Sequence, residues 1–254
     1  MKESVDRRAL GAFRCIDSIT GSSVVEPMAT SSTQLTVKPN HSGIYVIFNG
    51  PGLSALTTQF SPPTAATWAN PSSFEVTIQD PRRRYLPRRV QLQAPQALGA
   101  LSDAASFFNP QSVTLYPNGA APILPNWAVV RVSVVRTGTP PPNGLPWAVT
   151  RVTRTSDNTV LATGMADSQG EALMAVAGMG AQVSKNAAGA VTDVTVGVTV
   201  DAWFDTDIQK QPVGWIPNPD DVLNNLAKAT VKHNSANAQI AAGQAVSLSI
   251  AISV

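Results

Sequence analysis

Alternation of apolar and polar residues dominates this sequence and predicts β-strands. In residues 194–201 a valine occupies every second position, and residues 246–254 repeat the pattern with Val, Leu and Ile against Ser and Ala. A period of two places the apolar side chains on one face of a strand. Weaker alternation predicts strands over residues 43–48, 73–78, 89–93, 128–135 and 147–154. Pro, Gly, Asn and Ser separate these segments, so we predict an all-β chain built from antiparallel sandwiches.

Helical signal is confined to two short stretches. Asn218-Pro219-Asp220-Asp221 is typical of a helix start, with a capping Asn, a Pro in the first turn and acids at the positive end of the dipole. We expect a connector of about two or three turns there. Residues 97–106 have a mildly helical composition without an apolar stripe, and we interpret them as part of a linker.

Two halves of the chain carry a similar series of motifs. In each half a predicted strand runs into Thr-Gly, at residues 20–21 and at residues 137–138. Later in each half a glycine opens a strand that ends in Gly-X-Gly, at residues 50–52 and at residues 178–180. Two copies are too few for a solenoid, so the simple interpretation is two tandem domains of one type.

The length of 254 residues permits one or two globular domains with real cores. We predict that residues 1–95 form an N-terminal sandwich with a charged N-terminal arm, Lys2–Arg8. A linker follows in residues 96–111, and a second sandwich occupies residues 112–254.

Composition excludes several classes of protein. Charged residues make up only 13% of the chain and the net charge is +2, which argues against a charged disordered chain and against a polycation that binds nucleic acid. Cys15 is the only cysteine, so the chain is not a disulfide scaffold. No apolar run approaches the roughly 20 residues that span a bilayer. We therefore expect no membrane insertion, and the charged start of the sequence predicts no signal peptide.

One turn in the second half resembles a known family. In residues 160–174 an apolar strand reaches Ala166-Asp167-Ser-Gln-Gly170 and continues into another strand. Asp167 can accept hydrogen bonds from the amides that follow it, while Gly170 takes the left-handed position. This pattern resembles carboxypeptidase regulatory-like, or transthyretin-like, domains, and it implies a transthyretin-like sandwich. The sequence departs from that family at Ala172, where an aromatic or larger apolar residue is usual.

The order of motifs along the whole chain also resembles proteins encoded with phage tails and related contractile injection particles. The matching segments are residues 17–21, 42–46, 80–87 and 113–117, followed by the regulatory-like turn. This resemblance implies a non-enzymatic structural component, such as a baseplate, sheath-associated or fibre-adaptor protein. Its partners would be other particle subunits in an oligomeric assembly, formed in the bacterial cytoplasm and located in the virion or tail-like particle.

Candidate catalytic and metal-binding residues are sparse. His41 and His233 stand in polar, turn-like sequence, and the chain contains no Gly-x-Ser-x-Gly elbow. Cys15 lies in a predicted strand and is better explained as a small buried hydrophobe. The acids of residues 201–207 lack the spacing of a calcium loop. We expect neither an enzyme nor a cofactor or metal site.

One run of basic residues is the strongest candidate for binding a partner. It consists of Arg82, Arg83, Arg84, Arg88 and Arg89. Guanidinium groups bind carboxylates with paired hydrogen bonds, so the run predicts a docking patch for an acidic partner. The alternative is a solvated loop that protects an edge strand. A single run on this chain is not the extended basic footprint that nucleic acid requires.

Aromatic residues support a second functional hypothesis. Most of the five tryptophans are spread as expected for sandwich cores, while Trp203 and Trp215 lie beside loop sequence. If these two residues and Tyr116 were exposed together, they would form a platform for sugar rings. The alternative function is therefore a carbohydrate-binding or adhesin-type module.

Overall fold

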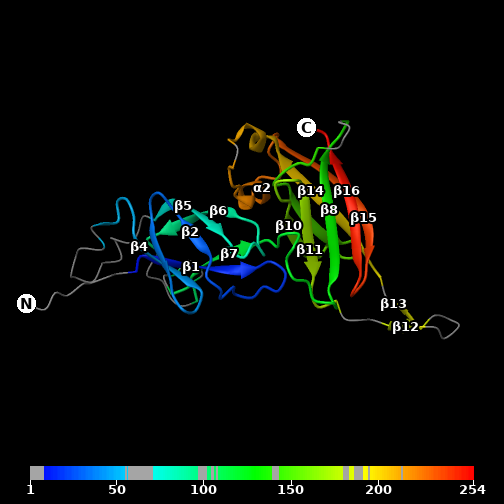
Figure 1. Ribbon diagram of the computed structural model, residues 1–254, viewed down its shortest axis with the longest axis horizontal. Helices are drawn as coiled ribbons and strands as arrows, with labels where there is room; N and C mark the ends of the chain where they lie inside the picture. The colour runs from blue at the N-terminus through cyan, green and yellow to red at the C-terminus, as the bar shows by residue number, and fades with distance from the viewer. Residues whose placement is uncertain are drawn as a thin grey trace, which may run out of the picture. The chain divides into compact units, whose positions relative to one another are not determined.

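The structure, a computed structural model, is all-β and falls into two compact units (Figure 1). It describes residues 9–54, 56, 71–96, 102–103, 106, 108–138, 143–179, 183–185, 191–193, 195–212 and 214–254. Unit 1 comprises residues 1–17, 22–81 and 87–115. Unit 2 comprises residues 18–21, 82–86 and 116–254.

Unit 1 contains two sheets in a sandwich-like arrangement. The first sheet has the order β3 (Thr36–Pro39), β4 (Ile44–Asn49), β1 (Gly11–Asp17), β7 (Gln111–Leu115). The second sheet has the order β2 (Ala29–Ser31), β5 (Ser72–Gln79), β6 (Arg88–Ala94). Strand β1 is antiparallel to β4 and parallel to β7, so the first sheet is mixed.

The core of unit 1 combines apolar packing with one buried charge. Phe13 of β1 stacks on Tyr45 of β4 with ring centroids 4.8 Å apart. The Tyr45 hydroxyl accepts a hydrogen bond of 2.5 Å from the Met28 N–H, which fastens the segment before β2 to this sheet. Arg88 is only 1% exposed and donates from Nη1 to the Thr114 carbonyl at 2.5 Å. The buried guanidinium therefore links β6 of one sheet to β7 of the other.

Unit 2 is also built from two main sheets. One has the order β11 (Glu171–Val176), β8 (Ala128–Arg136), β16 (Ala245–Ile252). The other, here called the four-stranded sheet, has the order β10 (Val160–Met165), β9 (Val149–Arg154), β14 (Val196–Asp205), β15 (Val231–Ile240). A small hairpin joins β12 (Val183–Lys185) to β13 (Val191–Asp193). The helices are η2 (Thr206–Lys210), a 3-10 helix, and α2 (Pro219–Leu223).

The core of unit 2 is filled by the alternate apolar positions of these strands. On β14 the fully buried side chains are Val198, Val200, Ala202 and Phe204. They pack with residues of β8 and β16, such as Val132 and Ile250. Burial of each such side chain contributes on the order of 2 kcal/mol before the cost of chain ordering. The period-two pattern of the sequence is therefore the pattern of this core.

Every strand predicted from alternation overlaps an observed strand, namely β4, β5, β6, β8, β9, β14 or β16. Residue 194, the first of its predicted strand, lies outside the described residues. The prediction of purely antiparallel sheets is wrong, because β1 and β7 are parallel and so are β8 and β16. In each unit the first and last strands lie side by side and run in the same direction.

The boundary between the units differs from the predicted one. Strand β7 pairs with β1, so residues 112–115 belong to unit 1 and not to the second domain. Gln96, at the start of the predicted linker, is buried. Its Oε1 accepts a hydrogen bond from the Ala12 N–H at 2.6 Å, and its Nε2 donates to the Asn109 carbonyl at 3.0 Å. The described parts of the predicted linker are thus integrated into unit 1.

Two local predictions are confirmed in geometric detail. Asp167 Oδ1 accepts from the amides of Gln169 at 2.7 Å and Glu171 at 3.0 Å, while Gly170 has a φ of +84°. Asn218 caps α2, although that helix has only five residues and is shorter than expected. Within the described ranges, no helix is long and apolar enough to cross a membrane.

Candidate interaction surface on the second unit

The outer face of the four-stranded sheet carries the densest group of functional side chains. Alternation along β14 sends Val200 and Ala202 into the core, so Asp201 and Trp203 lie on the opposite, outer face. On the neighbouring strands the same face carries Arg151 of β9 and His233 of β15. Three strands thus bring together residues that are separated by up to about 80 positions in the sequence.

These four residues form one connected cluster, which we name the Trp203 cluster. His233 lies opposite Trp203 in register, and their rings stack with centroids 5.1 Å apart. His233 Nε2 lies 2.8 Å from Asp201 Oδ1. The Arg151 guanidinium carbon lies over the Trp203 ring, 5.0 Å from its centroid. Strands β9 and β15 flank β14, so arginine and histidine approach the indole from its two sides.

Arg151 is the least satisfied member of the Trp203 cluster. Asp201 lies directly opposite it in register, but the carboxylate is engaged by His233. The Arg151 guanidinium forms no hydrogen bond or ion pair with any residue that the structure describes, and its Nε atom is buried without a partner. Stacking on Trp203 therefore holds a cation whose Nη donors remain available.

Strand β15 forms one edge of the four-stranded sheet. Thr206 N–H donates to the Thr230 carbonyl at 3.0 Å, and hydrogen-bonded pairs alternate along an antiparallel ladder. The even-numbered residues of β15 therefore bond β14, and residues 233, 235, 237 and 239 direct their backbone groups away from β14. On the other side of β14 the Thr155 N–H donates to the Gly197 carbonyl, which fits the same alternation.

A single asparagine covers part of this edge. Asn234 Nδ2 donates to the Ala251 carbonyl of β16 at 2.7 Å, and Asn234 Oδ1 accepts from the Ser235 N–H at 2.9 Å. The bond to Ala251 ties the edges of the two sheets together, and β15 also contacts β16 elsewhere along its length. Asn237 and Gln239 lie between this tie and the short loop of residues 241–244 that joins β15 to β16, and their exposed side chains carry no charge. This stretch of edge has the backbone groups required for strand addition.

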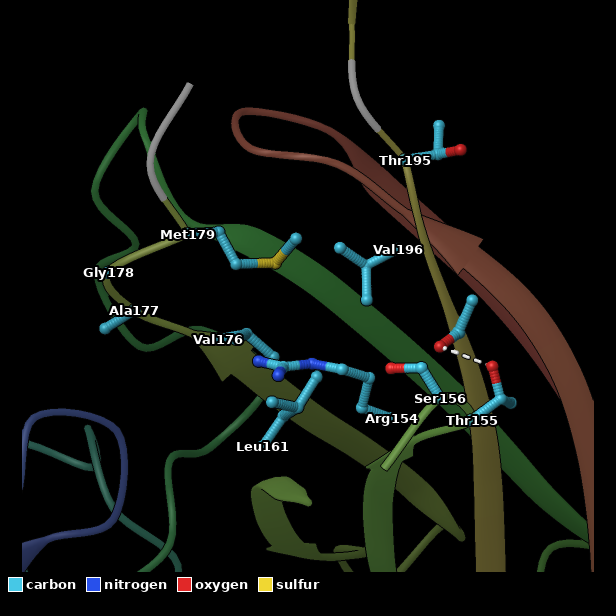
Figure 2. A pocket seen from close by; sticks show the side chains of 11 residues that line it. Arg154, Thr155, Ser156, Leu161, Val176, Ala177, Gly178, Met179, Thr195 and Val196 are labelled. Atoms are coloured by element: carbon cyan, nitrogen blue, oxygen red, sulfur yellow. Dashed lines mark hydrogen bonds between the residues drawn. The ribbon is translucent and has the colours of Figure 1, made fainter. Parts of the chain in front are cut away.

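A pocket of about 540 Å³ opens at one end of the second sandwich. Its polar wall is the turn of residues 154–156, and its apolar wall includes Leu161, Val176, Met179 and Val196. Figure 2 shows Met179 and Val196 pointing toward one another across the cavity. The apolar lining packs against the main core, so the pocket is an uncovered end of that core.

The polar wall of the pocket is held by local hydrogen bonds. Thr155 Oγ1 donates to the Gly197 carbonyl at 3.1 Å, and Arg154 Nη1 forms an ion pair of 3.0 Å with Asp157. The side chains on this wall supply neither a nucleophile with an adjacent base nor a pair of carboxylates. The apolar wall makes the pocket suited to holding an apolar group.

The predicted basic patch is divided by the fold. Arg88 is buried, and Arg89 pairs with Glu75 at 3.1 Å. Arg84 is half-buried, with its guanidinium 5.7 Å from the centre of the Tyr85 ring. Only Arg82 and Arg83 are exposed. The five arginines therefore do not share one exposed face, because the alternation of β6 turns Arg88 into the core.

The predicted aromatic platform is not assembled either. Tyr116 is only 3% exposed and packs with Leu86 and Met165, so its expected exposure is wrong. Trp203 and Trp215 are half-buried. The faces of the Trp203 indole are approached by Arg151 and His233, which leaves little room for a sugar ring.

Other candidate residues are explained by local structure. Burial raises the pKa of the Cys15 thiol to about 12, so it is not a thiolate nucleophile at neutral pH. Hydrogen bonds from Lys210 and Lys228 lower the pKa of Asp207 to about 2. Lysines thus neutralise the acidic segment that the sequence singled out. Among the residues with described positions, no group of three or more His, Cys, Asp or Glu side chains could hold a metal ion.

Sequence reasoning missed the two features that matter most here. The alternation of residues 147–154 places Arg151 on the polar face of a predicted strand, but it does not show which residues of other strands lie beside Arg151. Strand β15 was not predicted, because Lys232-His-Asn-Ser has the composition of a loop. Only the alanines and Ile240 in its second half follow the period of a strand.

The chain has no match among protein-family models and no match among curated proteins.

Proposed function

We propose that this protein is a non-enzymatic structural component of a phage tail or related contractile particle, with a baseplate, sheath-associated or fibre-adaptor role. It binds neighbouring subunits through sandwich edges and loops. The observation that carries the proposal is the edge strand β15. It has ten residues, against about five or six in a typical strand, and nine of them are exposed or half-exposed.

The composition of this edge supports association rather than isolation. Exposed edges in proteins are usually shortened or protected by lysine, proline or a bulge. Strand β15 has one lysine and no proline, and its pairing with β14 has no break in register over all ten residues. The low charge of the whole chain agrees with surfaces that become covered, since interface cores are depleted of charged residues.

The second unit supports the finer proposal of a transthyretin-like, or carboxypeptidase regulatory-like, domain. The turn that suggested this resemblance joins β10 to β11, and Asp167 and Gly170 play the roles expected for them. We propose that unit 1 is a related sandwich, because its first and last strands are paired in the same way. The placement in a phage-tail setting is supported by the arrangement of sequence motifs.

The proposal is tested by co-sedimentation in the native host. The tagged protein is expressed at its normal level, particle production is induced, and particles are separated on a density gradient. We expect the protein in the fractions that contain tail-like particles by negative-stain microscopy. A protein that remains entirely in the soluble fraction would contradict the proposed function.

A matched pair of variants tests whether the β15 edge is used. Asn237→Pro removes an N–H that points to the free side, so it spares the ladder with β14. Asn237→Ala makes the same loss of side chain, including its contact with Thr199, and keeps the N–H. We expect the proline variant to lose most of its incorporation and the alanine variant to retain it. Equal incorporation of both folded variants would exclude this edge.

A further inference from the structure

We propose that Arg151 binds the carboxylate of an acidic side chain on a neighbouring subunit, so that the outer face of the four-stranded sheet is an acid-docking surface. This inference rests on the proposed function, because it names the chemistry of the neighbour. It also replaces the basic run of residues 82–89 as the expected anchor, since that run is divided by the fold.

The Arg151 side chain is held in place before any partner arrives. Its guanidinium lies over the Trp203 ring, which is itself stacked with His233 on the adjacent strand. A planar cation that is already ordered loses less conformational entropy on binding than a free side chain. The rigid β-ladders beneath these residues fix the cluster further, because Arg151, Asp201 and Ser235 stand in one cross-strand row.

The hydrogen-bonding capacity of Arg151 is unused within the described part of the chain. Its Nε is buried and without an acceptor, and no ion pair joins it to Asp201 across the ladder. Nearly all buried polar groups in proteins find a partner, and an unmade bond at a charged group is costly. The Nη groups of Arg151 are not among the buried atoms, so a carboxylate from a partner can accept from both of them through two parallel bonds.

The surroundings favour a single carboxylate over other anions. The cross-strand neighbours of Arg151 are Thr163, which is neutral, and Asp201, which is acidic. Asp201 repels every anion, but it repels a doubly charged phosphate or sulfate about twice as strongly as a carboxylate, whose single charge is balanced by one guanidinium. Nucleic acid would require several cations along a track. Unpaired cations of this kind do not accompany Arg151 along its row of the sheet.

The first experiment measures carboxylate binding directly. The Nε–Hε NMR signals of Arg151 and Arg154 are assigned in the full chain and followed during titration with sodium acetate at constant ionic strength. Arg154 is the internal control because its Nη1 is already paired with Asp157. We expect a saturable shift at Arg151 that is larger than the shift at Arg154, with a weaker response to sulfate.

Two outcomes of the titration would overturn the proposal. An Arg151 signal that responds no more than that of Arg154 would show that the guanidinium is not an anion site. Sulfate that binds more tightly than acetate would show a general anion site rather than a carboxylate site. Neither outcome bears on whether the protein is a particle component.

The second experiment uses Arg151→Lys and the control Arg154→Lys in the co-sedimentation assay. Lysine keeps the charge but loses the paired hydrogen bonds, so we expect incorporation of the Arg151 variant to fall about tenfold while the control behaves as wild type. Normal incorporation of Arg151→Lys overturns the docking role and leaves the proposed function intact. If wild-type protein fails to co-sediment, the proposed function and the docking role fail together.

Discussion

The two units of this chain share one structural theme. In unit 1, β1 lies between β4, with which it is antiparallel, and β7, with which it is parallel. In unit 2, β8 lies in the same way between β11 and β16. Each of the antiparallel neighbours follows a glycine with positive φ, Gly43 in unit 1 and Gly170 in unit 2. The repeated sequence motifs therefore mark equivalent strands.

The third strand of each unit behaves differently. In unit 1, β3 pairs with β4 and widens the sheet that contains β1. In unit 2, β10 pairs with β9 and widens the opposite sheet. The difference coincides with the position of a hairpin turn. Asn40 closes the turn between β3 and β4, whereas Asp157 closes the turn between β9 and β10.

This difference determines where a broad surface is available. The four-stranded sheet of unit 2 carries Arg151 on its second strand, flanked by β10 and β14. The corresponding sheet of unit 1 has three strands, and one of them, β2, has only three residues. The transfer of one strand between sheets therefore gives unit 2 a wide face in a position where unit 1 has none.

The largest expected effect comes from replacing Gly170, which precedes β11 in unit 2 as Gly43 precedes β4 in unit 1. Gly170 has a φ of +84°, and an added Cβ would lie 2.6 Å from the Val134 carbonyl oxygen. We expect Gly170→Ala to lower the free energy of unfolding of unit 2 by about 4 kcal/mol, from backbone strain and steric overlap together. Chemical denaturation followed by tryptophan fluorescence measures this loss.

The control for this variant is Gly138→Ala. Gly138 also has a positive φ, +81°, but no atom lies within 4 Å of an added Cβ. Gly138→Ala should lower the free energy of unfolding by only about 1 kcal/mol, because the backbone strain at positive φ is not accompanied by steric overlap. Equal losses for the two variants would show that close backbone approach is not what requires glycine before β11.

The next prediction concerns the buried arginine that distinguishes the core of unit 1. Arg88→Ala removes the bond to the Thr114 carbonyl and leaves a cavity, so we expect unit 1 to lose about 3 kcal/mol of stability. Cys15 is fully buried in the same unit and reacts with a thiol reagent only when that unit opens. The rate of Cys15 labelling at pH 8 should therefore rise.

Tryptophan fluorescence provides the control for this variant. Four of the five tryptophans belong to unit 2, namely Trp127, Trp147, Trp203 and Trp215. We expect Arg88→Ala to accelerate labelling of Cys15 and to leave the main fluorescence transition in place. A fluorescence transition that shifts as far as the labelling rate would indicate that the two units unfold as one.

The sequence predicted the shared parts of the two units better than their differences. Alternating apolar residues identified β14 and β16, because burial on one face dictates the residue type at every second position. The Asp167–Gly170 turn was predicted because its hydrogen bonds are local. The sheet that receives β3 or β10 depends on contacts between distant segments, and no local pattern encodes it.

The candidate site was harder to predict for a related reason. Arg82–Arg84 and Arg88–Arg89 are adjacent in sequence, which suggested one surface, yet the alternation of β6 turns Arg88 inward. Arg151, Asp201 and His233 are distant in sequence and meet only through strand pairing. Composition identifies residue types, but register decides which of them become neighbours.

Acid should weaken unit 2 through one identified carboxylate. Hydrogen bonds from Lys210 and Lys228 lower the pKa of Asp207 from 3.8 to about 2. A folded-state pKa below the unfolded value contributes stability above pH 4, and this contribution is lost as the pH falls toward 2. We expect Asp207→Asn to reduce the stability of unit 2 at pH 7 and to flatten its pH dependence between pH 4 and 2. Fluorescence-detected denaturation at several pH values measures both effects.

The smallest expected effect tests what assigns the third strand to its sheet. Asp157 Oδ1 accepts from the Thr159 N–H at 3.0 Å, and Asn158 adopts a φ of +58°, so the turn is fixed locally. Strand β10 is held in addition by burial of Ala162 and Met165. If burial of β10 determines the sheet that it joins, Asp157→Ala should leave β10 paired with β9. Hydrogen exchange should then rise only at amides of the turn, such as the Arg154 N–H that donates to the Thr159 carbonyl.

Asn40→Ala is the matched variant in unit 1, where Asn40 Oδ1 accepts from the amides of Ser42 and Ile44, both at 2.9 Å. We expect the same local response, with β3 still paired with β4. Loss of exchange protection along the whole of β10 or β3 would instead show that a single side chain in the turn selects the sheet. In that event the broad face that carries Arg151 would depend on Asp157, and Asp157→Ala would also weaken acetate binding at Arg151.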